Sequence, residues 1–241
     1  TQNDVKKYEI WHGYYSFPNT QLIKNYRLSA KYDREYNHDN SLKMSAIQAY
    51  FTFLTVYNTN VFYNYEYDFY NSHLMSDFKD YINHYSRLSS RPFEFMDIQM
   101  SYAWGKDIAY REAIPKLGIR SNLDFKMAVN INNNLRLTPS INFEKLKKID
   151  SEEYFFDGYI ARLDFRYQFN TAFNFRVISE YNEFSDKFFV QPLISWRPNP
   201  DTIFYFGGNQ NYVDEFIDYN SPNYMVNKTQ LFLKFQYLIK S

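Results

Sequence analysis

The sequence predicts an all-β protein, an antiparallel transmembrane β-barrel of about 12 strands (range 10–14), formed by one domain over residues 1–241. Three observations lead to this prediction. Apolar and polar residues alternate along most of the chain, as they do in a strand with two different faces. The alternating segments are longer than ordinary globular strands, and aromatic residues are unusually frequent.

The composition narrows the fold class before any segment is considered. The chain has 25 tyrosines and 24 phenylalanines but only nine alanines, which argues against a mainly helical fold because aromatic residues favour strands and alanine favours helices. The 27 basic and 27 acidic residues cancel, so we expect no nucleic-acid partner held by bulk charge. The chain has no cysteine, which removes disulfides and thiolate zinc sites, and we expect no cofactor.

The alternation is clearest in three segments, 119–131, 159–169 and 231–240. In the second of these, the odd positions are mainly aromatic or aliphatic, as at Leu163, and most even positions are charged or polar, as at Asp164. A period of two over ten or more residues is typical of a strand whose faces meet different surroundings. These three segments are therefore predicted strands.

Weaker alternation extends over most of the remaining chain. Each expected strand is about 10 to 16 residues long, whereas globular strands have about 5 or 6 and membrane-spanning strands need about 9 to 11. The length therefore favours strands that cross a bilayer. The twelve expected strands are 6–17, 22–36, 43–57, 60–70, 92–104, 117–131, 135–146, 157–169, 172–182, 187–197, 202–212 and 228–240.

The connections in the C-terminal half are of two sizes. Short turns rich in Asn, Pro and Asp are expected at 132–134, 170–171 and 198–201, and longer polar connections at 147–156, 183–186 and 213–227. Short turns on one side and longer loops on the other are typical of outer-membrane barrels. The polar stretch 71–91 is expected to be a long loop, but in a count of twelve strands it falls on the side of the short turns. The count therefore misses or adds one strand in the N-terminal half, and 104–115 is one candidate for that strand.

Alternation alone leaves open which medium the apolar face meets. A soluble sandwich or lectin-like roll would bury it, whereas a membrane barrel turns it to lipid and turns the charges to the lumen. Strand length and aromatic residues near strand ends favour lipid. The charged residues expected to line the lumen are Arg120, Asp124, Lys126, Arg136, Glu144, Arg162, Asp164, Arg166, Arg176, Glu180 and Arg197.

Two interpretations of these charges remain open. They could line a polar pore and select its solute. Alternatively, long side chains of mixed sign on neighbouring strands could cross a narrow lumen as ion-pair ladders and close it, and the mixed signs favour this second interpretation.

Residues with catalytic chemistry are sparse. His73 and His84 lie with Asp77 and Asp80 in the expected loop 71–91, where solvated loop residues are a simpler interpretation than an ion site. Ser86 lies two residues after His84, so an outer-membrane barrel hydrolase with a Ser–His pair is a further hypothesis. Nothing in the sequence marks Ser86 as a nucleophile, and we expect no catalytic or metal-binding residue.

Several C-terminal segments resemble a known family. They include YIARLDFRYQF at 159–169, PLISWRPNPDTIFY at 192–205 and QLFLKF at 230–235. This region is similar to the C-terminal barrel of a Gram-negative outer-membrane family whose uncharacterised members join an N-terminal carbohydrate-binding-like domain to a membrane barrel. The likeness extends over about 157–212 and 228–240, and the carbohydrate-binding-like domain has no counterpart in this sequence.

The resemblance implies a barrel in the bacterial outer membrane and no established reaction. The leading functional hypothesis is a non-enzymatic barrel that serves as a subunit or scaffold of a larger outer-membrane assembly. The expected partners are the lipid bilayer with its lipopolysaccharide and other outer-membrane proteins. A small-solute channel and a barrel hydrolase are the alternatives.

Overall fold

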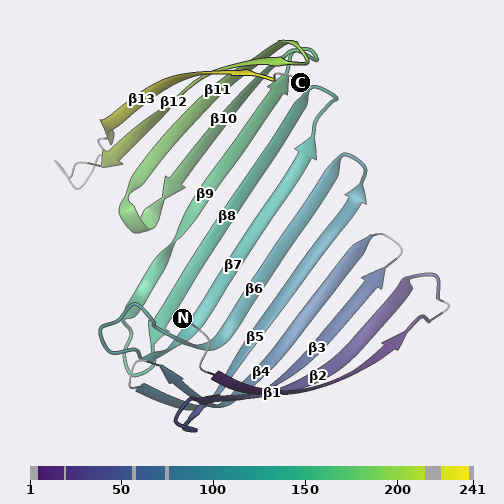
Figure 1. Ribbon diagram of the computed structural model, residues 1–241, viewed down its shortest axis with the longest axis vertical. Coiled ribbons are helices and arrows are strands. Elements are labelled where there is room, and N and C mark those ends of the chain that lie inside the picture. Colours follow the sequence, from purple (N-terminus) through teal and green to yellow (C-terminus); the bar gives the residue numbers. More distant parts are fainter. Residues whose placement is uncertain (1–4, 19, 56–57, 74–75, 215–223, 239–241) are drawn as a thin grey trace. The chain divides into compact units, whose positions relative to one another are not determined.

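In the part of the chain that the structure describes, thirteen long antiparallel strands form one sheet (Figure 1). The computed structural model describes residues 5–18, 20–55, 58–73, 76–214 and 224–238. The strands are β1 (Val5–Ser16), β2 (Ile23–Asn37), β3 (Leu42–Thr55), β4 (Thr59–His73), β5 (Ser76–Phe93), β6 (Met96–Ile108), β7 (Leu117–Asn130), β8 (Leu135–Lys148), β9 (Tyr154–Gln168), β10 (Phe173–Asn182), β11 (Lys187–Asn199), β12 (Thr202–Asp214) and β13 (Tyr224–Tyr237).

The strands pair in the order in which they occur in the sequence, from β1 to β13. Such a meander needs only short connections, and one single-turn 3₁₀ helix (Glu183–Ser185) lies between β10 and β11. Among the described residues no helix is both long and apolar enough to cross a membrane. The all-β prediction is confirmed, and in the described part of the chain no hydrogen bonds close the sheet into a barrel.

Two compact units can be distinguished along this sheet. Unit 1 comprises residues 1–92, 98–124 and 143–157, and unit 2 comprises residues 93–97, 125–142 and 158–241. Strands β5 to β9 contribute residues to both. Each unit has its own group of paired charges, around Asp33 in unit 1 and around Asp164 in unit 2.

The strand prediction was wrong at one place in the N-terminal half. The stretch 71–91, expected to be a polar loop, contains the end of β4 and almost all of β5, the longest strand at 18 residues. Its polar residues alternate with apolar ones too weakly to predict a strand, yet β5 pairs along its length with the aromatic-rich β4. The extra strand is therefore β5, and the connection after Trp104 begins only after Ile108.

Asparagine side chains build the short turns, as expected at residues 132–134, 170–171 and 198–201. The Oδ1 atom of Asn132 accepts hydrogen bonds from two backbone N–H groups, at 2.9 Å each. Asn170 does the same at 2.9 Å, and Asn199 accepts one bond at 3.1 Å. Because an Asn side chain can replace a backbone carbonyl in a turn, part of the high asparagine content is explained by the number of hairpins.

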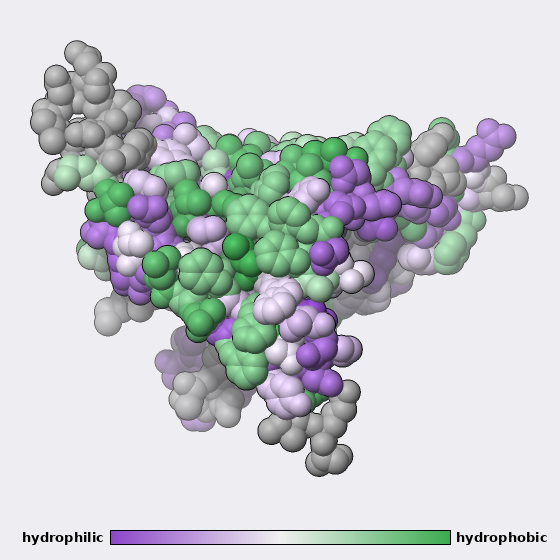
Figure 2. Space-filling view, turned by 90° about the horizontal axis from the view of Figure 1, so that it is seen from above, coloured by the Kyte–Doolittle hydropathy of each residue, from purple (hydrophilic) through white to green (hydrophobic). Residues whose placement is uncertain are grey.

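The C-terminal strand β13 in unit 2 has one mainly apolar face and one mixed face, on which Phe232 lies with the polar residues. The side chains of Leu231 and Leu233 are 74% and 75% exposed, and Phe235 and Tyr237, on the same face, are also exposed. Lys228, Gln230 and Lys234 occupy alternate positions and therefore lie on the opposite face. Figure 2 shows an area of the surface in which hydrophobic residues gather, bordered by hydrophilic ones.

The glycine pair in β12 provides the space for a large neighbour. Gly207 pairs with Phe232 of β13, and a Cβ atom at Gly207 would lie 2.8 Å from the Phe232 ring and 2.9 Å from the carbonyl oxygen of Pro192. Any larger residue at this position would displace the aromatic ring or the β11 backbone.

A test of the fold concerns Gly105 in β6, whose φ of 121° is rarely adopted by residues with a side chain. A Cβ there would lie 2.4 Å from the carbonyl oxygen of Ile82. Gly105→Ala should lower the free energy of unfolding in detergent by about 1–3 kcal/mol, measured by urea titration with tryptophan fluorescence.

Gly13→Ala is the matched control for this prediction. A Cβ at Gly13 approaches mainly the ring of Trp11, whose side chain is half exposed and can rotate away. The cost should stay below about 1 kcal/mol. Equal losses for the two variants would contradict the role assigned to the Gly105 backbone.

Candidate functional site

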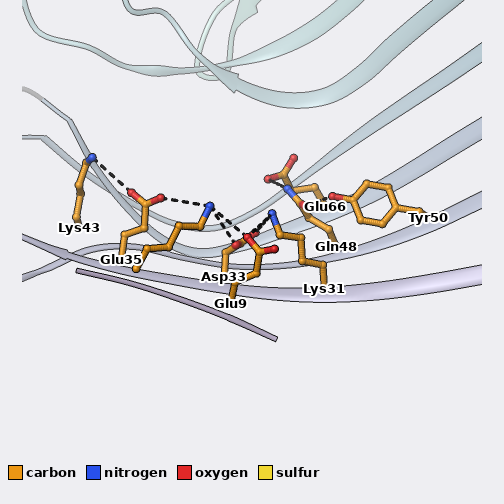
Figure 3. Close-up of polar contacts among 9 residues, drawn as sticks. Glu9, Lys31, Asp33, Glu35, Lys43, Gln48, Tyr50 and Glu66 are labelled. Carbon is orange, nitrogen blue, oxygen red and sulfur yellow. Dashed lines mark hydrogen bonds and ion pairs between the residues drawn. The ribbon is translucent and has the colours of Figure 1, made fainter. Parts of the chain in front are cut away.

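A network of alternating charges lies on the polar face of unit 1, in the first three strands (Figure 3). We call it the Asp33 network, and it consists of Lys7, Glu9, Lys31, Asp33, Glu35 and Lys43. Three lysines balance three carboxylates, and β1 and β2 place Glu9 directly opposite Asp33 in their shared register. The pairing of like charges is tolerated because the lysines lie between them.

Asp33 is the centre of this network. Its side chain is only 3% exposed and lies 2.8 Å from Nζ of Lys31 and 3.5 Å from Nζ of Lys7. The same two lysines contact Glu9 at 3.2 and 3.4 Å, and Lys7 also lies 3.8 Å from Glu35. A buried carboxylate requires such partners because removal from water is costly.

Polar contacts continue on the same face into β4. The side-chain amide of Gln48 donates a hydrogen bond of 2.7 Å to Glu66, and the hydroxyl of Tyr50 donates to the side-chain carbonyl oxygen of Gln48. Gln48 also pairs with Lys31 across β2 and β3. Together with the Lys7–Asp33 and Lys43–Glu35 ion pairs, these contacts link β1 to β4 through side chains as well as through their backbones.

Five of the eleven predicted lumen charges form ion pairs with one another in unit 2, on β9 and β10. Arg166 binds Asp164 through two hydrogen bonds of 2.9 and 3.0 Å, and Arg176 lies 3.4 Å from the same carboxylate. Arg162 contacts Glu180 at 3.3 Å. Arg176 pairs with Arg166 in the register of the two strands, so both side chains lie on one face and share Asp164.

The remaining predicted charges lie on β7, β8 and β11. Arg120 binds Asp107 at 2.8 Å, and Asp124 accepts a hydrogen bond of 3.1 Å from Ser101. In the part of the chain that the structure describes, no ion pair holds the other four, which are Lys126, Arg136, Glu144 and Arg197.

Three of the predicted arginines line an open cavity of about 1220 Å³ within unit 2. Arg136, Arg166 and Arg176 contribute to its lining, together with the asparagine turn 132–134 and polar side chains of β9, β10 and β11. We call this space the arginine cavity. Among the described residues its lining contains one acidic residue, Glu94 in the turn between β5 and β6.

Comparison with known proteins supplies no assignment for this arrangement. No family model, curated protein or solved structure matches the chain. The resemblance of the C-terminal segments to an outer-membrane family therefore stays a prediction. Any functional assignment has to rest on the chain's own geometry.

The predicted Ser–His neighbourhood has a different environment from the one expected. His84 and Ser86 lie in strand β5 and not in a loop. The Nδ1 atom of His84 is 2.8 Å from the hydroxyl of Tyr63, and its ring stacks on Trp104 with centroids 4.9 Å apart. Ser86 donates its hydrogen bond to the backbone carbonyl of Tyr102 at 3.3 Å. Serine and histidine thus contact other groups and do not form a nucleophile–base pair with each other.

Two acidic residues of the stretch 71–91, Asp77 and Asp80, accept hydrogen bonds from tyrosines of β4. The hydroxyl of Tyr70 donates to Asp77 at 2.7 Å and that of Tyr67 to Asp80 at 2.8 Å. The described ranges contain no group of three or more His, Asp or Glu side chains that could hold a metal ion.

The Asp33 network is not among the predicted lumen charges, which all lie between Arg120 and Arg197. A signal was present, since Lys7 and Glu9, and likewise Lys31, Asp33 and Glu35, recur at a spacing of two. This spacing places charges on a single face of a strand. An ion-pair network also requires charges of opposite sign to meet on neighbouring strands, and the register of the strands decides whether they do.

Comparison of Asp33 with Glu9 tests whether the network supports the fold. Asp33→Asn removes the buried carboxylate and leaves Glu9 as the carboxylate that Lys7 and Lys31 still share, so the free energy of unfolding should fall by about 1–3 kcal/mol. Glu9→Gln changes a carboxylate that contacts the same lysines but is 46% exposed, and should cost less than about 1 kcal/mol. Urea titrations of both variants measure the difference, and equal effects would contradict the central role of Asp33.

Proposed function

We propose that the chain is a non-enzymatic β-barrel of the bacterial outer membrane that serves as a subunit or scaffold of a larger outer-membrane assembly. The observation that carries the proposal is the combination of an exposed apolar face with an ion-paired polar face. On β13 the apolar face presents Leu231 and Leu233, both about three-quarters exposed. On β9 and β10 the polar face carries the pairs Asp164–Arg166 and Arg162–Glu180.

A lipid environment suits the apolar face better than water does. A soluble sandwich would cover Leu231, Leu233 and Phe235 with a second layer of side chains, yet in the described part of the chain these residues stay exposed. Large exposed apolar surfaces indicate an interface or a membrane. Strands of 10 to 18 residues are long enough to cross a bilayer and extend beyond it.

A scaffold role agrees with the chemistry of the polar face. Its charges are largely engaged with one another, as at Asp33 and Asp164, and the serine and histidine of β5 hydrogen-bond to other groups. Such pairs add side-chain links between strands that are already joined by backbone hydrogen bonds. These ion pairs make the sheet more rigid. They do not place a general base beside a nucleophile.

The number of strands constrains how this proposed barrel closes. In an antiparallel meander, β1 and β13 are both odd-numbered and therefore run in the same direction. Direct pairing of the two would be parallel, whereas one additional strand between them would preserve antiparallel pairing and an even number. Bacterial barrels of a single chain have even strand numbers, and an odd number is known from a mitochondrial barrel.

The lipid-facing role can be tested in β13. Leu233→Arg should prevent or weaken folding into liposomes, because arginine in the hydrocarbon region costs about 2–4 kcal/mol at the bilayer midplane. Folding is measured by extraction with detergent and by the faster migration of the unheated protein on a gel.

Gln230→Arg is the matched control, since it adds the same residue to the polar face of the same strand. Folding of this variant should equal that of the parent chain. Equal losses in both variants, or recovery of the parent as a soluble monomer in plain buffer, would contradict the membrane proposal.

A small-solute channel is the second candidate, and the arginine cavity is the observation that favours it. Single-channel recording in planar bilayers separates the two. The scaffold proposal predicts no steady open state, and it also predicts partner proteins that co-purify after extraction with mild detergent. A stable conductance that changes with Arg136→Gln would favour the channel.

A further inference from the structure

The arginine cavity has an excess of positive charge that its own acidic residues do not cancel. Arg166 and Arg176 share the carboxylate of Asp164. Arg136 forms no ion pair with any residue that the structure describes. Among the described residues, two carboxylates stand against these three guanidinium groups, Asp164 and the Glu94 side chain of the lining, so one positive charge remains in excess. In the Asp33 network, by contrast, acidic and basic groups are equal in number.

The guanidinium groups retain donors that can reach a ligand. Arg166 donates hydrogen bonds from Nε and Nη2 to the carboxylate of Asp164, and its Nη1 hydrogens remain available to a ligand. Arg136 is exposed at the start of β8, and no described residue accepts a hydrogen bond from its guanidinium group. The planar fork of arginine matches the geometry of carboxylate and phosphate groups.

Neutral hydrogen-bonding groups complete the lining of the cavity. They come from the asparagine turn 132–134, from Gln168 and from Asn174. The hydroxyl of Ser195 donates to the Oδ1 atom of Asn174 at 2.6 Å, and this contact leaves the Asn174 amide N–H group as an available donor. The Asn134 side chain donates to the backbone carbonyl of Gln168 at 2.6 Å, which holds the turn against the neighbouring strand. A volume of about 1220 Å³ is sufficient for a ligand the size of a sugar.

We propose that the arginine cavity binds a hydroxylated organic anion, a sugar that carries a phosphate or carboxylate group. The guanidinium groups of Arg136, Arg166 and Arg176 bind the anionic group. The asparagine and glutamine side chains bind the hydroxyl groups. This role goes beyond that of a scaffold, because a membrane-embedded subunit can function without a ligand in this cavity.

Isothermal titration calorimetry of the full chain in detergent micelles tests the proposal, with glucose 6-phosphate and glucuronate as anionic probes and glucose as the neutral one. At least one anion should bind saturably and at least about tenfold more tightly than glucose. Arg136→Gln should weaken that binding about tenfold or more, because it removes a charged donor. Arg136→Lys should weaken it less, since it keeps the charge but not the fork.

Arg162→Gln provides the matched control. It removes an arginine from the same face of β9 that pairs with Glu180 and is not part of the cavity lining. Anion affinity should stay within about twofold of the parent in this variant. Three results would overturn the proposal: no saturable binding of either anion, equal binding of glucose, or an equal loss in Arg162→Gln and Arg136→Gln.

The same preparations distinguish failure of this inference from failure of the proposed function. A heat-shifted gel band shows that each variant is folded in the detergent before titration. A folded, membrane-extracted protein without anion binding would contradict the ligand and leave the scaffold role intact. Saturable anion binding by a protein that dissolves without detergent would support the ligand and contradict the membrane role.

Discussion

The hydrogen bonding of the backbone between neighbouring strands is the constraint on which the other features depend. Each strand from β2 to β12 pairs with a neighbour on both sides, so the backbone N–H and C=O groups of these strands are satisfied within the sheet and not by the medium on either face. Side chains on the two faces are then free to suit two different media. This separation allows Leu231 and Leu233 to be exposed on one face of β13 while Lys228 and Lys234 lie on the other.

The register of the paired strands decides which side chains meet across the sheet. Asp33 lies opposite Glu9 in β1 and opposite Ala46 in β3, and this arrangement leaves room for Lys7 and Lys31 to approach the buried carboxylate. A shift of one residue would turn Asp33 to the apolar face without a partner. The ion pairs of the polar face therefore act as a check on register, since only the native pairing satisfies them.

Alternation made most of the fold predictable, and its weakness at β5 explains the error there. Segments such as 159–169 carry charges on one face and aromatics on the other, so a local pattern suffices. In β5, by contrast, Asp77 and Asp80 accept hydrogen bonds from tyrosines of β4. These contacts depend on how the two strands pair, which the sequence of β5 alone does not reveal. The same limit applies to the arginine cavity, where Arg136 was predicted to face a polar space but its neighbours Arg166 and Arg176 are 30 or more residues away.

The two charged regions differ in a way that bears on their roles. In the Asp33 network every lysine contacts a carboxylate, and the side chain of Asp33 is almost fully buried. The charges therefore stabilise the contact between three strands. Because they neutralise one another, they exert little electrostatic attraction on a ligand. Around the arginine cavity, two arginines share one carboxylate and Arg136 is exposed. An excess of guanidinium groups in one place raises the energy of the empty site through repulsion, and an anion relieves that repulsion when it binds. Charges that balance one another thus point to structure, and charges left in excess beside a cavity point to recognition.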